Sequence, residues 1–270
     1  MRSTHENIQI VNTTISDSLN AIRGNSINGL RVENLTVSNM TARPFSLGSI
    51  TNAHFFNVSV TATPEMGFSF QYGNDNVQIL NSTVSEAALG LFIDGQNFHL
   101  RNLKLVNSGF GIDGREGSSV ISINNLIANI SGSANSAGVL MRNNSWGVFE
   151  HNTFAQIEDI GLNFAVMSYL RLQNSLVADT GAAVVRYTSG GPSEVLEKNN
   201  AFDQTLFDFF TPDISSLIGD PLFKDPTTNN FRLKPESPFV DVGITLPYVF
   251  DDLEGTLRND GSYDIGALEN

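Results

Sequence analysis

The phrase IQIVNTTIS, at residues 8–16, recurs eight more times in the first three quarters of the chain. Apolar residues alternate, then come Asn, a small polar residue and a further apolar residue. The other copies are LRVENLTVS (30–38), AHFFNVSVT (53–61), VQILNSTVS (77–85), FHLRNLKLV (98–106), ISINNLIAN (121–129), VFEHNTFAQ (148–156), LRLQNSLVA (170–178) and LEKNNAFDQ (196–204). Repetition of this kind is typical of a solenoid, in which each repeat buries its apolar face against the next.

The spacing of the repeated Asn identifies the kind of solenoid. Successive asparagines lie 21 to 28 residues apart, 23.5 on average. The nine positions are Asn12, Asn34, Asn57, Asn81, Asn102, Asn124, Asn152, Asn174 and Asn200. This length suits a coil of three short strands, and no leucine consensus of a leucine-rich repeat is present. The sequence therefore predicts an all-β, right-handed parallel β-helix of about nine coils.

The excess of Asn has a structural explanation in such a fold. The chain contains 30 asparagines, although Asn is poor in helix and strand interiors. Asn tolerates the left-handed backbone angles of a bend between strands. Coils stacked about 4.8 Å apart would bring successive amides within hydrogen-bonding distance. We expect the nine asparagines to form one ladder, with residues such as Val77 and Ile79 pointing inward.

Composition limits the partners. The net charge is -13, which repels nucleic acid and anionic lipid. No apolar run reaches the 18 residues of a membrane span, and the chain has no cysteine. The start, MRSTHENIQI, lacks the apolar region of a secretory signal and suggests a mature form or a truncated product. We expect a monomer that neither binds nucleic acid nor inserts into a membrane.

After Asn200 the repeat ends and a different sequence follows. It reads GDPLF from Gly219, FRLKPESPFVDVG from Phe231, DLEGTLR from Asp252 and GSYDIGALE from Gly261. These motifs, in this order, resemble the C-terminal module of many bacterial β-helix proteins of the pectate-lyase-like superfold. The resemblance implies an extracellular or cell-envelope protein associated with polysaccharide. We expect coils over residues 1–200 and a capping module over 201–270, packed on the last coil.

Candidate site residues stand where outward positions depart from Ser, Thr and Asn. If Leu91 and Ile93 point inward, Asp94 points outward, and the same logic brings out Asp113 and then Arg142. We predict these three as catalytic candidates. Arg115, Asn143 and the single tryptophan, Trp146, are predicted to bind substrate, with the indole as a stacking platform for sugars. The longest coil adds the loop SGSANSAG from Ser131.

Each role depends on the reaction. Asp94 and Asp113 would be the acid and base of an inverting glycosidase if their carboxyls lie about 6.5–9.5 Å apart. In a lyase, Asp113 and Glu116 would hold Ca²⁺, while Arg115 or Arg142 handles the proton. The structural alternative is that Asp94-Gly95 and Asp113-Gly114 are turns and that the arginines pair with surface acids.

The residues favour binding over catalysis. The Asn-Thr-Asp, Asp-Asp, His-Gly and Arg-x-Lys set of polygalacturonase-like hydrolases is missing, as is the vicinal Asp cluster of pectate lyases. We therefore expect a protein that binds polysaccharide without turnover and requires no cofactor. A lyase or glycoside hydrolase acting on acidic polysaccharide is the alternative.

A remote alternative is an ice-binding solenoid. After the ladder Asn, the first four coils carry hydroxyl residues at alternate positions, such as Thr14 and Ser16 or Thr36 and Ser38. These would form two exposed columns of hydroxyls. Such residues also simply suit exposed strands.

Overall fold

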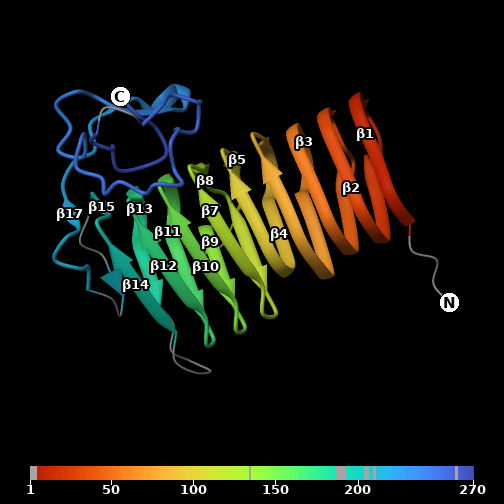
Figure 1. Cartoon of the computed structure of the whole chain (residues 1–270), viewed down its shortest axis with the longest axis horizontal. Helices are drawn as coiled ribbons and strands as arrows, with labels where there is room; N and C mark the ends of the chain where they lie inside the picture. The colour runs from red at the N-terminus through yellow and green to blue at the C-terminus, as the bar shows by residue number, and fades with distance from the viewer. Residues whose placement is uncertain (1–4, 134, 187–192, 204–206, 209–210, 259–260) are drawn as a thin grey trace.

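The computed structural model describes residues 5–133, 135–186, 193–203, 207–208, 211–258 and 261–270. Within them the chain forms one elongated stack of parallel coils (Figure 1). The parallel sheet contains β1 (His5–Ser16), β2 (Ile22–Ser38), β3 (Phe45–Leu80), β4 (Thr83–Arg101), β5 (Lys104–Ser108), β6 (Ile112–Arg115), β7 (Ser119–Ile123), β8 (Leu126–Ile130), β9 (Ala137–Arg142), β10 (Trp146–Glu150), β11 (Thr153–Ala165), β12 (Tyr169–Gln173), β13 (Leu176–Arg186), β14 (Glu194–Lys198), β15 (Ala201–Phe202), β16 (Phe207–Asp208) and β17 (Leu217–Ile218).

Each coil has three faces, named here by their short strands. Face A contains β6 and β9, face B contains β7, β10, β12 and β14, and face C contains β5 and β8. Long strands such as β2 and β4 bend through the corners and contribute to all three faces. The predicted parallel β-helix is thus confirmed.

The corner between faces B and C carries the predicted ladder in the first coils. Asn12, Asn34 and Asn57 have φ angles of 53°, 50° and 53°, in the left-handed region that Asn tolerates. The amide of Asn34 donates to Asn12 at 2.8 Å, and that of Asn57 donates to Asn34 at 2.8 Å. Asn102 likewise donates to Asn81 at 3.0 Å. Backbone angle and side-chain bonding therefore both favour Asn at this corner.

The prediction was wrong at two of the nine positions. In the coil that contains Asn152, the corner residue is His151, with φ 52°, and Asn174 lies 2.8 Å from its Nε2. In the last coil the corner residue is Asn199, which donates to Asn174 at 3.0 Å. Where two polar residues are adjacent in sequence, their types do not show which one adopts the left-handed backbone angle.

Asn152 and Asn200 form a second, interior column instead. The Oδ1 of Asn152 accepts the backbone N–H of Asn125 at 3.0 Å, and the Oδ1 of Asn200 accepts that of Ser175 at 2.8 Å. Both asparagines are fully buried. They satisfy backbone donors inside the stack, which would otherwise cost free energy.

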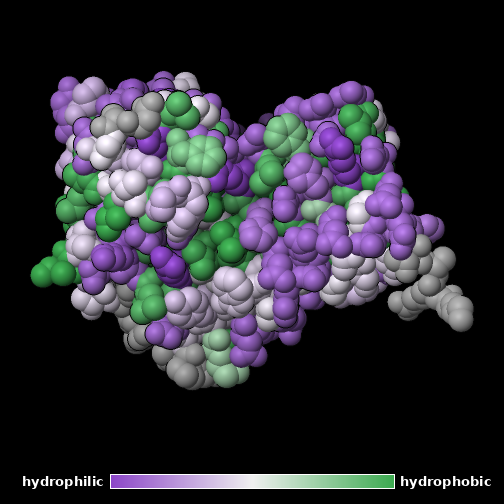
Figure 2. All heavy atoms as spheres, viewed as in Figure 1, coloured by the Kyte–Doolittle hydropathy of each residue, from purple (hydrophilic) through white to green (hydrophobic). Residues whose placement is uncertain are grey.

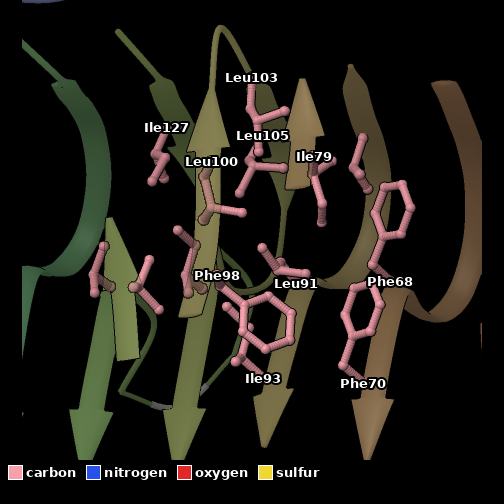
Figure 3. Packing of buried hydrophobic residues seen from close by; sticks show 14 of the residues in the cluster. Phe68, Phe70, Ile79, Leu91, Ile93, Phe98, Leu100, Leu103, Leu105 and Ile127 are labelled. Atoms are coloured by element: carbon pink, nitrogen blue, oxygen red, sulfur yellow. The ribbon is translucent and has the colours of Figure 1, made fainter. Parts of the chain in front are cut away.

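The core fills the interior of the coils. Phe45 stacks on Phe68 with ring centroids 4.5 Å apart, and Phe70 meets Phe98 edge-to-face at 5.1 Å. Aliphatic side chains fill the space next to these rings (Figure 3). Figure 3 labels Ile79, Leu91, Ile93, Phe98 and Leu100 among these inward residues, as the alternation predicted.

Residues 219–270 do not sit where the sequence analysis expected them. Strand pairing continues to β17, and the segment then folds back along the outside of face C (Figure 1). It contains β18 (Phe223–Asp225), the 3-10 turn η1 (Pro226–Thr228) and the antiparallel β19 (Asn230–Leu233). Its apolar side chains, such as Phe239 and Ile265, pack on Leu126, Ala155 and other outward residues of face C. The segment therefore covers a flank of the later coils.

Polar contacts fix this segment to the ladder corner. Asn124, which would continue the ladder, donates to the carbonyl oxygen of Asp251 at 2.6 Å. Arg258 is fully buried, pairs with Glu269 and contacts the Oδ1 of Asn124 at 3.4 Å. Among the described residues, no helix is long and apolar enough to cross a bilayer.

The ladder makes a measurable contribution to stability. We expect Asn34→Ala to lower the free energy of unfolding by about 1–2 kcal/mol more than Asn39→Ala does, in urea denaturation. Asn39 is the control because its φ of 52° matches that of Asn34, while its side chain makes no hydrogen bond within the described residues. Equal losses would show that only the backbone angle matters.

The histidine in the ladder predicts a pH dependence. Burial, and then the charge of Arg258, lower the pKa of His151 well below 6.5. The unfolded chain therefore binds more protons, and stability falls as the pH drops below about 6.5. We expect His151→Asn to reduce the loss of stability between pH of about 7 and 5, measured by denaturation at each pH. His99→Asn, at an exposed position, is the control and should leave the slope unchanged.

Candidate functional site

The candidate residues lie on the outer side of face A, in two columns that run along the stack. Phe92 pairs with Asp113 and Asp113 with Leu140, while Leu140 pairs with Asn163. In the neighbouring column Asp94 pairs with Arg115, and Ala165 pairs with Arg142. Asp94, Asp113 and Arg142 all lie on the outer side of the strands, but Asp113 belongs to the first column and Asp94 and Arg142 to the second.

Asp113 is held between two arginines. Its carboxylate accepts Nε of Arg115 at 2.9 Å, Nη2 of Arg115 at 2.5 Å and Nη2 of Arg142 at 3.1 Å. Only 5% of Asp113 is exposed. The guanidinium of Arg115 also lies over the ring of Phe92, 5.2 Å from its centroid. These contacts hold Asp113 as a structural anion and fix the two arginines.

A hollow of about 540 Å³ opens beside this triad. It is lined by Arg115, Glu116, Asn135, Leu140, Arg142, Asn143, Ile160, Asn163, Ala165 and Val166. Asn135, in the loop of the longest coil, contributes to one wall of the hollow. Glu116 accepts the amide of Asn143 at 2.6 Å, which closes the rim.

Two buried polar atoms among the residues lining the hollow have no partner within the described residues. They are Nε of Arg142, a donor, and Oδ1 of Asn163, an acceptor. Only 8% of Asn163 is exposed. A buried polar atom without a hydrogen bond costs about 1–3 kcal/mol, so a ligand group or water that gains access to either atom is stabilised there.

Asp94 lies in a different hollow, at the corner that follows face A. Asp75, Asn97 and Glu116 share this hollow with it. Burial, and then the negative charge of Glu116, raise the pKa of Asp94. Asp113 does not line this hollow, so Asp94 and Asp113 do not share it, and their role as an acid and base pair stays a prediction.

Trp146 does not line the hollow either. It begins β10 on face B, beyond the corner that contains Asn143, and it is 38% exposed. Its neighbour in the next coil is Tyr169. Figure 2 shows apolar residues gathered in the middle of the visible face, beside the notch between the C-terminal segment and the first coils. A platform at Trp146 would therefore act apart from the arginines.

The calcium site stays a prediction that these contacts do not favour. The oxygens of Asp113 are taken up by arginines, and Glu116 bonds to Asn143. In the part of the chain that the structure describes, no three His, Asp or Glu side chains are grouped to hold a metal.

The hydroxyl columns expected on face C are present. Thr14 pairs with Thr36, Thr36 with Ser59 and Ser59 with Thr83, before Lys104 ends the column. Lys104 pairs with Glu254 of the C-terminal segment at 3.0 Å. The outward residues of face C therefore carry hydroxyl groups where they are exposed. They are apolar where the segment 219–270 covers them. Burial explains this change, and ice binding stays a remote prediction.

Sequence reasoning missed Asn163 and Leu140. Once the Gly-led strands are aligned, Asn163 of GLNFA follows the position of Asp113 by two coils. The long loop before β9 hid this alignment, because it shifts the spacing of the coils.

The chain belongs to the family of right-handed β-helix proteins. The family model described as "Right handed beta helix region" matches residues 70–206, just over half of the chain. Among solved structures, the chain is similar to pectate lyase Pel9A, with a TM-score of 0.56 and 11% identity over 97% of this chain and 88% of that one. No curated protein sequence matches. At this identity the likeness establishes the fold alone.

The two arginines predict that Asp113 is structural. We expect Asp113→Asn to lower the free energy of unfolding by about 2 kcal/mol, because it leaves two fixed guanidiniums without their anion. Glu33→Gln is the control, since Glu33 also binds an arginine two residues away, Arg31 at 2.6 Å, but in a more exposed pair. Chemical denaturation measures both. A loss no greater than that of the control would contradict a structural role.

Proposed function

We propose that this chain is an extracellular or cell-envelope protein that binds polysaccharide on face A without turning it over. The observation that carries the proposal is that Arg142 and Asn163 both line one hollow, while Nε of Arg142 and Oδ1 of Asn163 have no hydrogen-bond partner within the described residues. A sugar hydroxyl both accepts and donates, so the hydroxyls of a sugar match both the donor of Arg142 and the acceptor of Asn163. The name of the similar structure, a pectate lyase, supports a polysaccharide as the partner.

The charges of the site support binding over acid–base chemistry. Asp113 is neutralised by two arginines, and Asp94 belongs to another hollow. An inverting mechanism needs two free carboxyls with substrate between them. The rigid outer face of a solenoid suits binding, because ordered side chains lose little entropy when a ligand arrives.

A catalytic alternative has one observation in its favour. The raised pKa of Asp94 suits a general acid, and Glu116 lies close enough to contribute to it. This reading predicts sugar products, which vanish in Asp94→Asn.

Binding to a panel of alginate, pectate, xylan and mixed-linkage β-glucan tests the proposal by titration calorimetry. We expect saturable binding to at least one of them, without unsaturated or reducing ends being released. Asn163→Ala and Arg142→Ala should each weaken this binding about tenfold, the cost of one good hydrogen bond.

Arg31→Ala is the matched control, because it removes a surface arginine from an ion pair far from the hollow. Binding that survives in both site variants, or an absence of binding across the panel, would contradict the proposal. Release of sugar products would contradict the binding proposal and support the catalytic alternative.

A further inference from the structure

A second hollow lies on the same outer face, near the N-terminal end. It has a volume of about 410 Å³ and is lined by Arg23, Gly24, Asn25, Ser46, Leu47, Gly48, Gln71 and Tyr72. Arg23 pairs with Ser46, and Asn25 with Gly48, in adjacent coils of face A. The lining contains one cationic side chain and no carboxylate, on a chain of net charge -13.

Tyr72 is held in place, although half of it is exposed. A Cβ built on Gly48 would lie 3.1 Å from Cζ of Tyr72, so the ring lies directly against the backbone at this glycine. The phenolic oxygen of Tyr72 accepts the amide of Asn25 at 2.8 Å. The ring is thus fixed at its face and at its tip, and 50% of the residue remains open to solvent.

Polar groups surround this ring. The side-chain amide of Gln71 donates to Oγ of Ser46 at 3.4 Å, and its side-chain oxygen makes no hydrogen bond within the described residues. Arg23 is exposed and makes no ion pair within the described residues. A fixed aromatic face beside hydrogen-bonding groups matches a sugar, which presents C–H bonds on one face and hydroxyls around its edge.

We propose that this hollow is a second sugar-binding subsite, with Tyr72 as the stacking platform and Arg23 and Gln71 as contacts for hydroxyls. The inference rests on the proposed function of the first hollow, the one lined by Arg142 and Asn163. About four coils separate the two hollows, or roughly 20 Å along the axis at the coil spacing of a parallel sheet. One extended polysaccharide chain along face A reaches both, and its second contact strengthens binding through effective concentration.

Oligosaccharides of two and eight sugars, prepared from alginate, pectate, xylan and mixed-linkage β-glucan, test this inference by calorimetry. For the polysaccharide that binds in the panel, we expect the wild-type protein to bind its eight-sugar oligosaccharide at least tenfold more tightly than its two-sugar one. Tyr72→Ala should remove most of this difference. Gly48→Ala should act in the same direction, since its methyl group displaces the ring without removing it.

Phe56→Ala is the control, because Phe56 is an aromatic residue of the same coils, 36% exposed on face B. Circular dichroism verifies that each variant is folded. If the longer oligosaccharide has no advantage, or keeps it in Tyr72→Ala and Gly48→Ala while Asn163→Ala weakens binding, the second subsite is refuted and the proposed function stands. If no oligosaccharide or polysaccharide binds to the wild-type protein, the proposed function fails, and the inference fails with it.

Discussion

The structure depends on a sharp bend that every coil must make at the same place. Residues at the corner between faces B and C adopt left-handed backbone angles, and their side chains bond along the stack. Asn meets both demands at low cost, because its short amide tolerates this backbone and both donates and accepts. Once the corners are aligned, the strands fall into parallel register, and the apolar residues of each face meet inside.

The sequence was sufficient to predict this architecture, but not its exact alignment. Asn recurs often enough to reveal the coil, yet His151 replaces it once, and the pair Asn199–Asn200 offers two choices. Only the backbone angle decides between them. The position of residues 219–270 was also beyond the pattern, because apolar residues on the outside of face C look like core residues in sequence.

The sequence predicted the candidate site only in part, because it does not show how the coils are aligned. Alternation in strands identified Asp94, Asp113, Arg115 and Arg142 as outward residues, and this was correct. It did not show which of them are neighbours, because register between coils depends on loop lengths. Asn163 and Tyr72 were missed because neither departs from its surroundings in sequence. Asn163 is identified only by its buried Oδ1 without a partner, and Tyr72 only by the contact of its ring with Gly48.

The site follows from the same constraint that builds the fold, since stacked coils align outward side chains along face A at a fixed spacing. A crystal structure with a bound eight-sugar oligosaccharide of the polysaccharide that binds in the panel tests this account most directly. The account predicts a sugar chain parallel to the solenoid axis on face A, with hydroxyls bound to Arg142 and Asn163 and a sugar ring on Tyr72. A sugar chain bound to face B at Trp146, or to the hydroxyl columns of face C, would contradict it.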